Sequence, residues 1–220
     1  MEPSFWHARW QEGQIGFHRP SVHPDLLAHG PAVWGEAPCR ILVPLCGKSH
    51  DLPHLAALGH TVVGAELSPL AVEALHAEHG LPGRPAPRGA LRVWDNPGLC
   101  VLEGDFFATT PADAGGRCDA AWDRAALVAL APPQRAAYAA HLRRWLRPGA
   151  SILLNTFQYD QSRHDGPPWS VEDSVVHTLF ADCTRTLLAR RNLLEAEPRW
   201  AERGHTWVHD ALWHITVPHA

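Results

Sequence analysis

The segment Leu45-Cys46-Gly47-Lys48-Ser49 follows a short apolar run, and its residue types point to a loop that meets a ligand. A dinucleotide site needs the pattern G-x-G-x-x-G, because its glycines let the backbone and a helix N-terminus cradle a diphosphate. This segment has a single glycine. The letters GKS also end the pattern G-x-x-x-x-G-K-[ST], but the first glycine of that pattern is missing. The loop therefore argues against a bound diphosphate.

A carboxylate stands at the distance expected for a ribose ligand. Glu66 lies 19 residues after Gly47, at the end of a second apolar run. An acid about 20 residues past such a loop can accept hydrogen bonds from both ribose hydroxyls. An adenosine ligand without phosphates satisfies both observations, and S-adenosylmethionine (SAM) is such a ligand. The alternative is that Glu66 only caps the helix expected after Ser68.

The residues around this loop predict alternating strands and helices. Residues 41–45 and 61–66 are typical of buried strands, and residues 50–59 and 69–79 are typical of helices, the second with Ser68 as its N-cap. Strand–helix–strand–helix order with short connections indicates a parallel sheet. Ligands of such sheets bind at the carboxyl ends of the strands, which is where the loop and Glu66 would lie.

The rest of the chain continues the pattern without an internal repeat or a long linker. Further helices are expected over 5–12, 24–30, 132–147 and 171–181, and Ser170 with Asp173 would form a capping box at the start of the last one. A hairpin is expected to turn at Asp95-Asn96-Pro97-Gly98. Further strands are expected over 119–122, 151–157, 184–194 and 212–217. Residues 81–90, rich in proline and glycine, are expected to be mobile. The prediction is one doubly wound α/β domain over 1–220 with a helical N-terminal extension over about 1–36.

Composition excludes several function classes. The 220 residues are 45% hydrophobic, enough for a core, and the net charge of −4 offers no basic surplus for a nucleic acid. No apolar run approaches the roughly 20 residues of a membrane span, and the N-terminus lacks the apolar region of a signal peptide. Five cysteines without a C-x-x-C pair indicate a reducing compartment. A cytoplasmic protein without a membrane or nucleic-acid partner is expected.

The 16 histidines raise the question of a metal site. Two pairs, His50 with His54 and His205 with His209, have the i,i+4 spacing of one helix face. No third ligand follows at a diagnostic distance, and the H-E-x-x-H pattern is absent. We therefore expect no metal and interpret these histidines as surface or core residues.

Five sequence blocks resemble the thiopurine S-methyltransferase family, particularly its bacterial members. They are FWHARW with GFH, LVPLCGKSHDLPHLA with VVGAELSPLAVE, GDFFAT, WDRAALVAL, and GPPWSV after YDQ, in the family's order and over nearly the whole chain. The resemblance implies an α/β class I SAM-dependent methyltransferase fold. In that fold a doubly wound, seven-stranded, mostly parallel sheet ends in an antiparallel strand.

The resemblance also implies which residues form the site. It places SAM contacts at Trp10, Leu45, Glu66 and Arg124, the adenine beside Asp105 and Phe106, Trp6 on the flank of the pocket, and Phe17 and Arg203 on the acceptor side. The family's mammalian members have a histidine directly after the late arginine. Here Gly204 stands in that place, so an acceptor role of that imidazole does not transfer.

Each expected role has a structural alternative. Trp6 and Trp10 share a helical face and could attract the sulfonium of SAM by about 0.5–2 kcal/mol, or could pack on the core. Leu45 and Gly47 would present backbone groups to the methionine part of SAM, because a glycine allows close approach. Arg124 could hold the carboxylate of SAM or an acceptor thiolate, or could form an internal ion pair with Asp123 or with a glutamate.

The predicted reaction is an in-line methyl transfer to a thiol or thiopurine-type acceptor. An aromatic thiol ionises near neutrality, so the enzyme mainly has to align the reacting atoms, and no residue is expected to act as a general base. One alternative is a methyltransferase for selenium or tellurium compounds, with which bacterial relatives are linked. Two others are a nicotinamide-dependent oxidoreductase and a SAM-binding protein without turnover. A monomer with a small-molecule thiol or chalcogen acceptor is expected.

Overall fold

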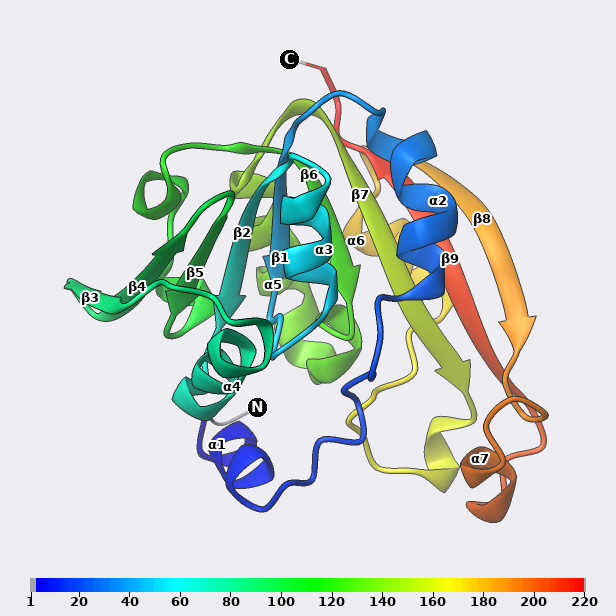
Figure 1. Ribbon diagram of the computed structural model, residues 1–220. Helices are drawn as coiled ribbons and strands as arrows, with labels where there is room; N and C mark the ends of the chain where they lie inside the picture. Colours follow the sequence, from blue (N-terminus) through cyan, green and yellow to red (C-terminus); the bar gives the residue numbers. More distant parts are fainter. Residues whose placement is uncertain (1–2, 220) are drawn as a thin grey trace.

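A computed structural model describes residues 3–219 and shows a nine-stranded sheet between two layers of helices (Figure 1). Residues 1, 2 and 220 of the predicted domain lie outside the described residues. The strands are β1 (Arg40–Pro44), β2 (Thr61–Glu66), β3 (Pro85–Arg88), β4 (Leu91–Asn96), β5 (Leu99–Glu103), β6 (Cys118–Arg124), β7 (Leu146–Tyr159), β8 (Thr184–Asn192) and β9 (Val208–Thr216).

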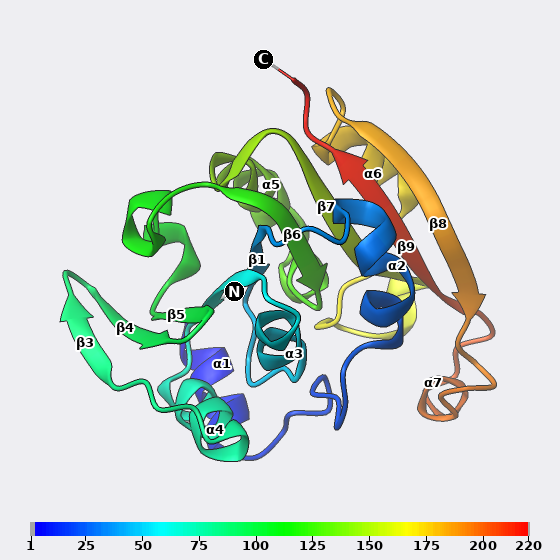
Figure 2. The same cartoon turned by 45° about the horizontal axis from the view of Figure 1, so that its top comes forward.

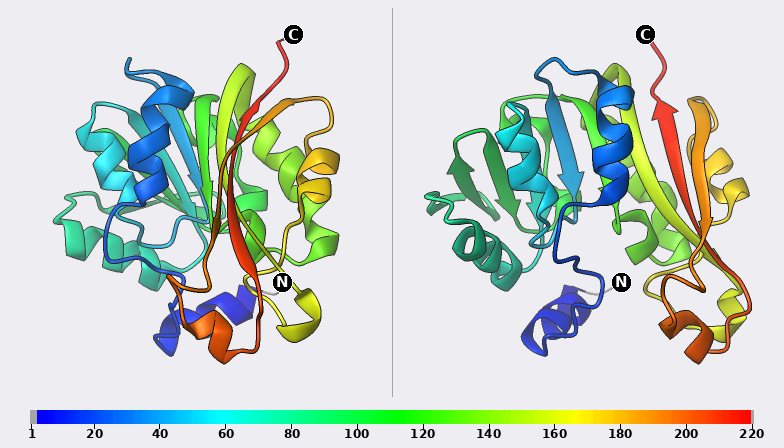
Figure 3. Two further views of the ribbon diagram at one scale, coloured as in Figure 1. Left: turned by 90° about the vertical axis from the view of Figure 1, so that its right-hand side faces the viewer. Right: turned by 45° about the vertical axis from the view of Figure 1, so that its right-hand side comes forward.

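The helices cover both faces of this sheet. They are α1 (Pro3–Gln11), α2 (Pro24–Trp34), α3 (Asp51–Ala57), α4 (Pro69–His79), α5 (Arg135–Arg144), α6 (Asp173–Leu179) and α7 (Arg199–Glu202). Figure 3 shows α2, α3 and α4 on one face and α5 and α6 on the other. Each layer buries its own apolar cluster against the sheet: Leu26, Leu52 and Leu75 belong to the first, and Tyr138 and Val176 belong to the second. No helix among the described residues is long and apolar enough to cross a membrane.

The strand order confirms the doubly wound fold. It runs β3-β4-β5-β2-β1-β6-β7-β9-β8, with β5, β2, β1, β6 and β7 parallel and β9 antiparallel to β7. Seven of these strands, β5-β2-β1-β6-β7-β9-β8, form the predicted sheet, and two more extend it at one edge. The hairpin that turns at Asn96 to Leu99 adds β4, and β3 pairs with β4 from Pro85↔Trp94 to Arg88↔Leu91. The segment 81–90, expected to be mobile, therefore contains an edge strand (Figure 2).

Two further local predictions are wrong because tertiary contacts decide them. The helix expected to run to Arg147 ends at Arg144, and β7 begins at Leu146, the sheet partner of Cys118. The hydroxyl of Ser170 accepts a hydrogen bond from the Tyr159 backbone (3.1 Å) and donates to Glu172 (3.2 Å). It is therefore not available to cap α6, which begins at Asp173.

Candidate active site

The carboxyl ends of β1 and β6 carry unusual backbone conformations. Among residues 3–219, the non-glycine residues with positive φ are Leu45 (47°) and Ala125 (64°). Each directly follows one of these two strands, which lie next to each other where the strand order reverses. Such conformations cost energy and gather at functional sites, and ligands of doubly wound sheets bind at this point. The edge between β1 and β6 is therefore the candidate active site.

The Glu66 carboxylate ties the first loop to the second strand. Its Oε2 accepts a hydrogen bond from the Gly47 backbone (2.8 Å), and its Oε1 accepts one from the Ser68 backbone (2.7 Å). Burial raises the pKa of this carboxyl, and the backbone donors oppose the rise. Ser68 is the N-cap residue of α4, but its own hydroxyl makes no capping bond. Glu66 thus supports the start of α4, and its two oxygens offer about four acceptor positions, more than the backbone donors of Gly47, Leu67 and Ser68 use.

Three aromatic side chains gather over the loop. A Cβ added to Gly47, whose φ is +56°, would lie 3.3 Å from Cζ2 of Trp10. The rings of Trp10 and Trp6 each meet Phe17 edge-on, with centroids 5.7 Å apart. No residue of α1 is buried, so its tryptophans do not belong to the core. The structure therefore brings Trp6, Trp10, Phe17 and Gly47 together over the loop.

The space over Gly47 yields a testable prediction. We expect Gly47→Ala to lower the free energy of unfolding by about 1–2 kcal/mol, because a Cβ disfavours a positive φ. The same Cβ presses on Trp10, so the affinity for SAM, the ligand expected from the sequence, should fall at least severalfold in calorimetry. Gly80→Ala is the matched control: Gly80 has a φ of +59° and no heavy atom within 4 Å of an added Cβ. Equal losses of SAM affinity in both variants would contradict the contact.

Arg124 is a cation without a counter-ion. Its Nη1 donates to the Phe17 carbonyl (2.7 Å), and it forms no ion pair with any residue in 3–219. The alternative pairing with Asp123 is wrong, because that carboxylate accepts from Tyr138 Oη (2.7 Å) and the Leu127 backbone. Burial lowers the pKa of Arg124 to about 10, and it remains charged at neutral pH.

The residues predicted beside the adenine lie at the end of β5. Asp105 is exposed and its Oδ1 accepts from the Phe107 backbone (3.0 Å), which caps the short helix Phe106–Ala108. The Phe106 ring is buried, with its centroid 5.8 Å from that of Tyr138 and 6.5 Å from that of Trp145. This ring faces the core, so only the backbone of Phe106 is available for the predicted contact.

The last predicted residue, Arg203, lies in a later element of the chain. Arg203 is exposed at the end of α7, and its guanidinium lies 5.9 Å from the Trp200 ring centre. The neighbouring Arg199 donates to the Gly16 carbonyl (3.3 Å), so α7 contacts the segment that carries Phe17. Lys48 forms an ion pair with Glu78 of α4. No group of three or more histidine, cysteine or acidic residues within 3–219 could hold a metal ion.

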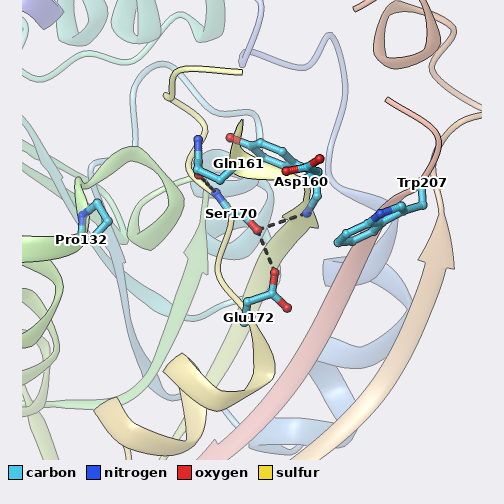
Figure 4. Close-up of a pocket in the computed structure, with 7 residues that line it drawn as sticks. Pro132, Asp160, Gln161, Ser170, Glu172 and Trp207 are labelled. Atoms are coloured by element: carbon cyan, nitrogen blue, oxygen red, sulfur yellow. Dashed lines mark hydrogen bonds between the residues drawn. The ribbon is translucent and has the colours of Figure 1, made fainter. Parts of the chain in front are cut away.

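A separate pocket lies at the carboxyl end of β7 (Figure 4). Its lining consists of Pro132, Tyr159, Asp160, Gln161, Ser170, Glu172 and Trp207. Ser170 stands at its centre and makes hydrogen bonds with the Tyr159 backbone and Glu172. None of the predicted site residues lines this pocket.

The sequence interpretation missed two residues near Arg124. Asn155 of β7 is the sheet partner of Arg124, and Arg19 follows Phe17 by two positions and acts electrostatically on Arg124. A signal for the first exists in the sequence, because Asn155 interrupts the apolar run of residues 152–154. Arg19 has no such signal.

A family model described as Thiopurine S-methyltransferase matches residues 1–217. The chain belongs to this family. Its relatives include the Thiopurine S-methyltransferases of Pseudomonas entomophila (strain L48), 42% identical over 217 residues (98% of this chain and 100% of that protein), and of Pseudomonas fluorescens (strain SBW25), 43% identical over 218 residues (99% and 100%).

Solved methyltransferases share the fold of this family member. One is the 1,6-didemethyltoxoflavin-N1-methyltransferase of Burkholderia thailandensis with bound 1,6-didemethyltoxoflavin and S-adenosylhomocysteine. Its TM-score is 0.61 at 15% identity, over 98% of this chain and 87% of that one. Another is a SAM-dependent methyltransferase of Methanosarcina mazei. Its TM-score is 0.63 at 15% identity, over 91% of this chain and 100% of that one. The chain is a SAM-dependent methyltransferase of the class I fold, and SAM is its cofactor.

The residues at the β1–β6 edge fit this cofactor. Glu66 offers a buried carboxylate at the end of β2, where a ribose is expected in this fold class. The loop has one glycine, and Trp10 occupies the space that a side chain would fill. Arg124 offers an unpaired positive charge to a carboxylate.

Proposed function

We propose that the enzyme transfers the methyl group of SAM to the sulfur of a small thiol, of the thiopurine type, by in-line displacement. The observation that carries this proposal is Arg124, a charged guanidinium without a counter-ion beside Phe17. A cation in this position favours the thiolate over the thiol, because it stabilises the anionic form. No general base is then required, since the solvent takes the thiol proton before the reaction.

The roles of the other residues follow from their places. When bound, SAM supplies a methyl group activated by the positive charge on its sulfur. Glu66 would bind the ribose hydroxyls, and the backbone of Leu45 and Gly47 would bind the methionine part. The remaining assignments are Trp6 and Trp10 as the aromatic cover that excludes water and faces the cation, Asp105 and Phe106 beside the adenine, and Phe17 and Arg203 on the acceptor side.

The proposal treats residues 1–220 as one methyltransferase domain. The N-terminal segment, about 1–36, would supply part of the cover over the site, and its support is the contact of Trp10 with Gly47. A monomer in the cytoplasm is the simplest setting. All five cysteines are free, which is typical of a reducing compartment.

A selenium or tellurium acceptor is the second candidate. An unpaired arginine stabilises any anionic chalcogen, so the observation at Arg124 favours a selenolate or tellurite as well as a thiolate. The two candidates differ in the atom of the acceptor that is methylated. The residues proposed for the site are the same in both.

Thermal unfolding with ligands and an acceptor panel test the proposal. We expect SAM and S-adenosylhomocysteine to raise the melting temperature, by the equivalent of about 2.7 kcal/mol at 100-fold excess over Kd, and NAD(P)H to leave it unchanged. With SAM, benzenethiol and a thiopurine should be methylated faster than a selenol or tellurite. Protection by NAD(P)H alone would support an oxidoreductase. Binding of SAM without methylation of any acceptor would support a protein without turnover.

A further inference from the structure

A buried amide without a partner lies beside Arg124. Asn155 of β7 is 2% exposed, and its Nδ2 is a buried donor that makes no hydrogen bond. Its direct sheet partners are Arg124 on β6 and Leu212 on β9. Paired residues of neighbouring strands present their side chains on the same face of a sheet, so the amide lies between these two side chains. Buried donors are nearly always satisfied, so an unpaired one beside a candidate site can serve a ligand, an ion or a water.

A second unpaired donor faces the same region. Nε of Arg19 is buried without a hydrogen bond, and Arg19 forms no ion pair with any residue in 3–219. The charge of Arg19 acts on both Arg124 and His23. The His23 ring packs on Trp122, with centroids 5.4 Å apart, and Trp122 precedes Arg124 by two positions on the same strand face. Arg19 therefore lies within electrostatic range of Arg124, the sheet partner of Asn155.

The carboxylates of this region are already used by other donors. Asp51 accepts from Trp122 Nε1 (2.7 Å) and from the His23 backbone (2.8 Å). Asp25 forms an ion pair with Arg191 of β8. The charges of Asp51 and Glu197 act on Arg124, but neither carboxylate forms an ion pair with it. Asn155 and Arg124 thus lie side by side as donors without a paired carboxylate.

We propose that Asn155 and Arg19 contact the acceptor and select one that carries an anionic oxygen group, such as a carboxylate, besides its reacting sulfur. This inference rests on the proposed methyl transfer. A carboxylate has two oxygens with about four acceptor positions, and it matches a set made only of donors. A neutral thiol would leave the buried amide and the Arg19 guanidinium unpaired, and a site built from such donors discriminates strongly against a ligand that lacks their partner.

Two matched aromatic thiols test the inference: 4-mercaptobenzoate, which carries the carboxylate, and benzenethiol, which does not. We expect the wild-type kcat/KM to be at least about tenfold higher for 4-mercaptobenzoate. Asn155→Leu removes the amide at similar volume and should lower this kcat/KM by at least about tenfold, mainly through KM. Its kcat/KM for benzenethiol should fall much less than that for 4-mercaptobenzoate, and its Kd for SAM should change by less than about twofold. Thr156→Val is the control, because Thr156 is equally buried on the opposite face of the same strand.

The outcomes separate the possibilities. Equal losses for both thiols, or a weakened Kd for SAM with an unchanged thiol preference, would overturn the inference, because Asn155 would then be structural or would bind the cofactor. If Asn155→Leu does not fold, Arg19→Met decides: it removes the second donor without placing a charge beside Arg124, and it should lower the preference for 4-mercaptobenzoate at least severalfold. A wild-type enzyme that methylates both thiols equally overturns this inference alone. A wild-type enzyme that binds no SAM overturns the proposed function as well.

Discussion

Glu66→Gln is expected to weaken SAM binding by roughly 10- to 100-fold, the equivalent of about 1.5–3 kcal/mol for a hydrogen bond to a charged group. The structure adds a second reason for a large effect. The carboxylate accepts from both Gly47 and Ser68, whereas glutamine has one oxygen and would direct its amide N–H groups at one of these donors. The loop would then shift as well as the ribose contact. Calorimetry with SAM measures the loss.

Glu103→Gln is the matched control for this prediction. Glu103 is the sheet partner of Glu66 on β5, and both residues are 6% exposed. The oxygens of Glu103 accept from Arg92 Nε (2.7 Å) and Trp94 Nε1 (2.9 Å), both on β4. Its replacement should lower stability and leave the Kd for SAM within about twofold, because these donors belong to the sheet and not to the loop. Unchanged SAM affinity in Glu66→Gln would refute the ribose assignment.

Arg124→Met is expected to lower kcat/KM for a thiol acceptor by about 10- to 100-fold at sub-saturating SAM. The substitution removes the buried charge and the hydrogen bond to the Phe17 carbonyl together. Arg124→Lys should lose less, since it retains the charge. A lysine ammonium lacks the planar fork that lets an arginine hold the carbonyl with one nitrogen and a ligand with another. Steady-state kinetics with benzenethiol measures both variants.

Arg147→Met controls for the loss of a positive charge. Arg147 pairs with Asp119 and its side chain is 58% exposed, so its replacement should leave kcat/KM within about twofold. Wild-type kinetics in Arg124→Met would remove the observation on which the proposed function rests. A fall in Arg124→Met that Arg124→Lys fully restores would show that charge alone matters there, and not the fork geometry.

Local patterns predicted the parallel centre of the sheet well, because its signals are local. The runs 41–45 and 61–66 are apolar and followed by helices with clear ends, and they became β1 and β2 with shifts of one residue or less. The edge was harder to predict. Residues 85–88 have a composition that disfavours strands, and they are extended because β4 offers them a partner.

Some residues of the candidate site could likewise be predicted from local sequence, and others could not. Glu66 and Gly47 could be found because loop and acid are separated by a distance that recurs in this fold class. Asn155 lies 31 positions after Arg124, and only the pairing of β6 with β7 makes them neighbours. Side-chain direction also escaped prediction. The Phe106 ring faces the core because Tyr138 and Trp145, which belong to the same buried apolar cluster, offer it apolar contacts.

The two prolines of β3 affect how separate molecules can meet. Alternate residues of a strand direct their N–H groups to the same side, and a proline has none to donate. The N–H groups of Ala86 and Arg88 are therefore the ones that face β4, and Pro85 and Pro87 face the outer side of the strand. A foreign strand arriving there would find carbonyl acceptors but no donors from residues 85–88. Fibril-like stacking of chains, which begins at such open borders, is thereby disfavoured at this end of the sheet.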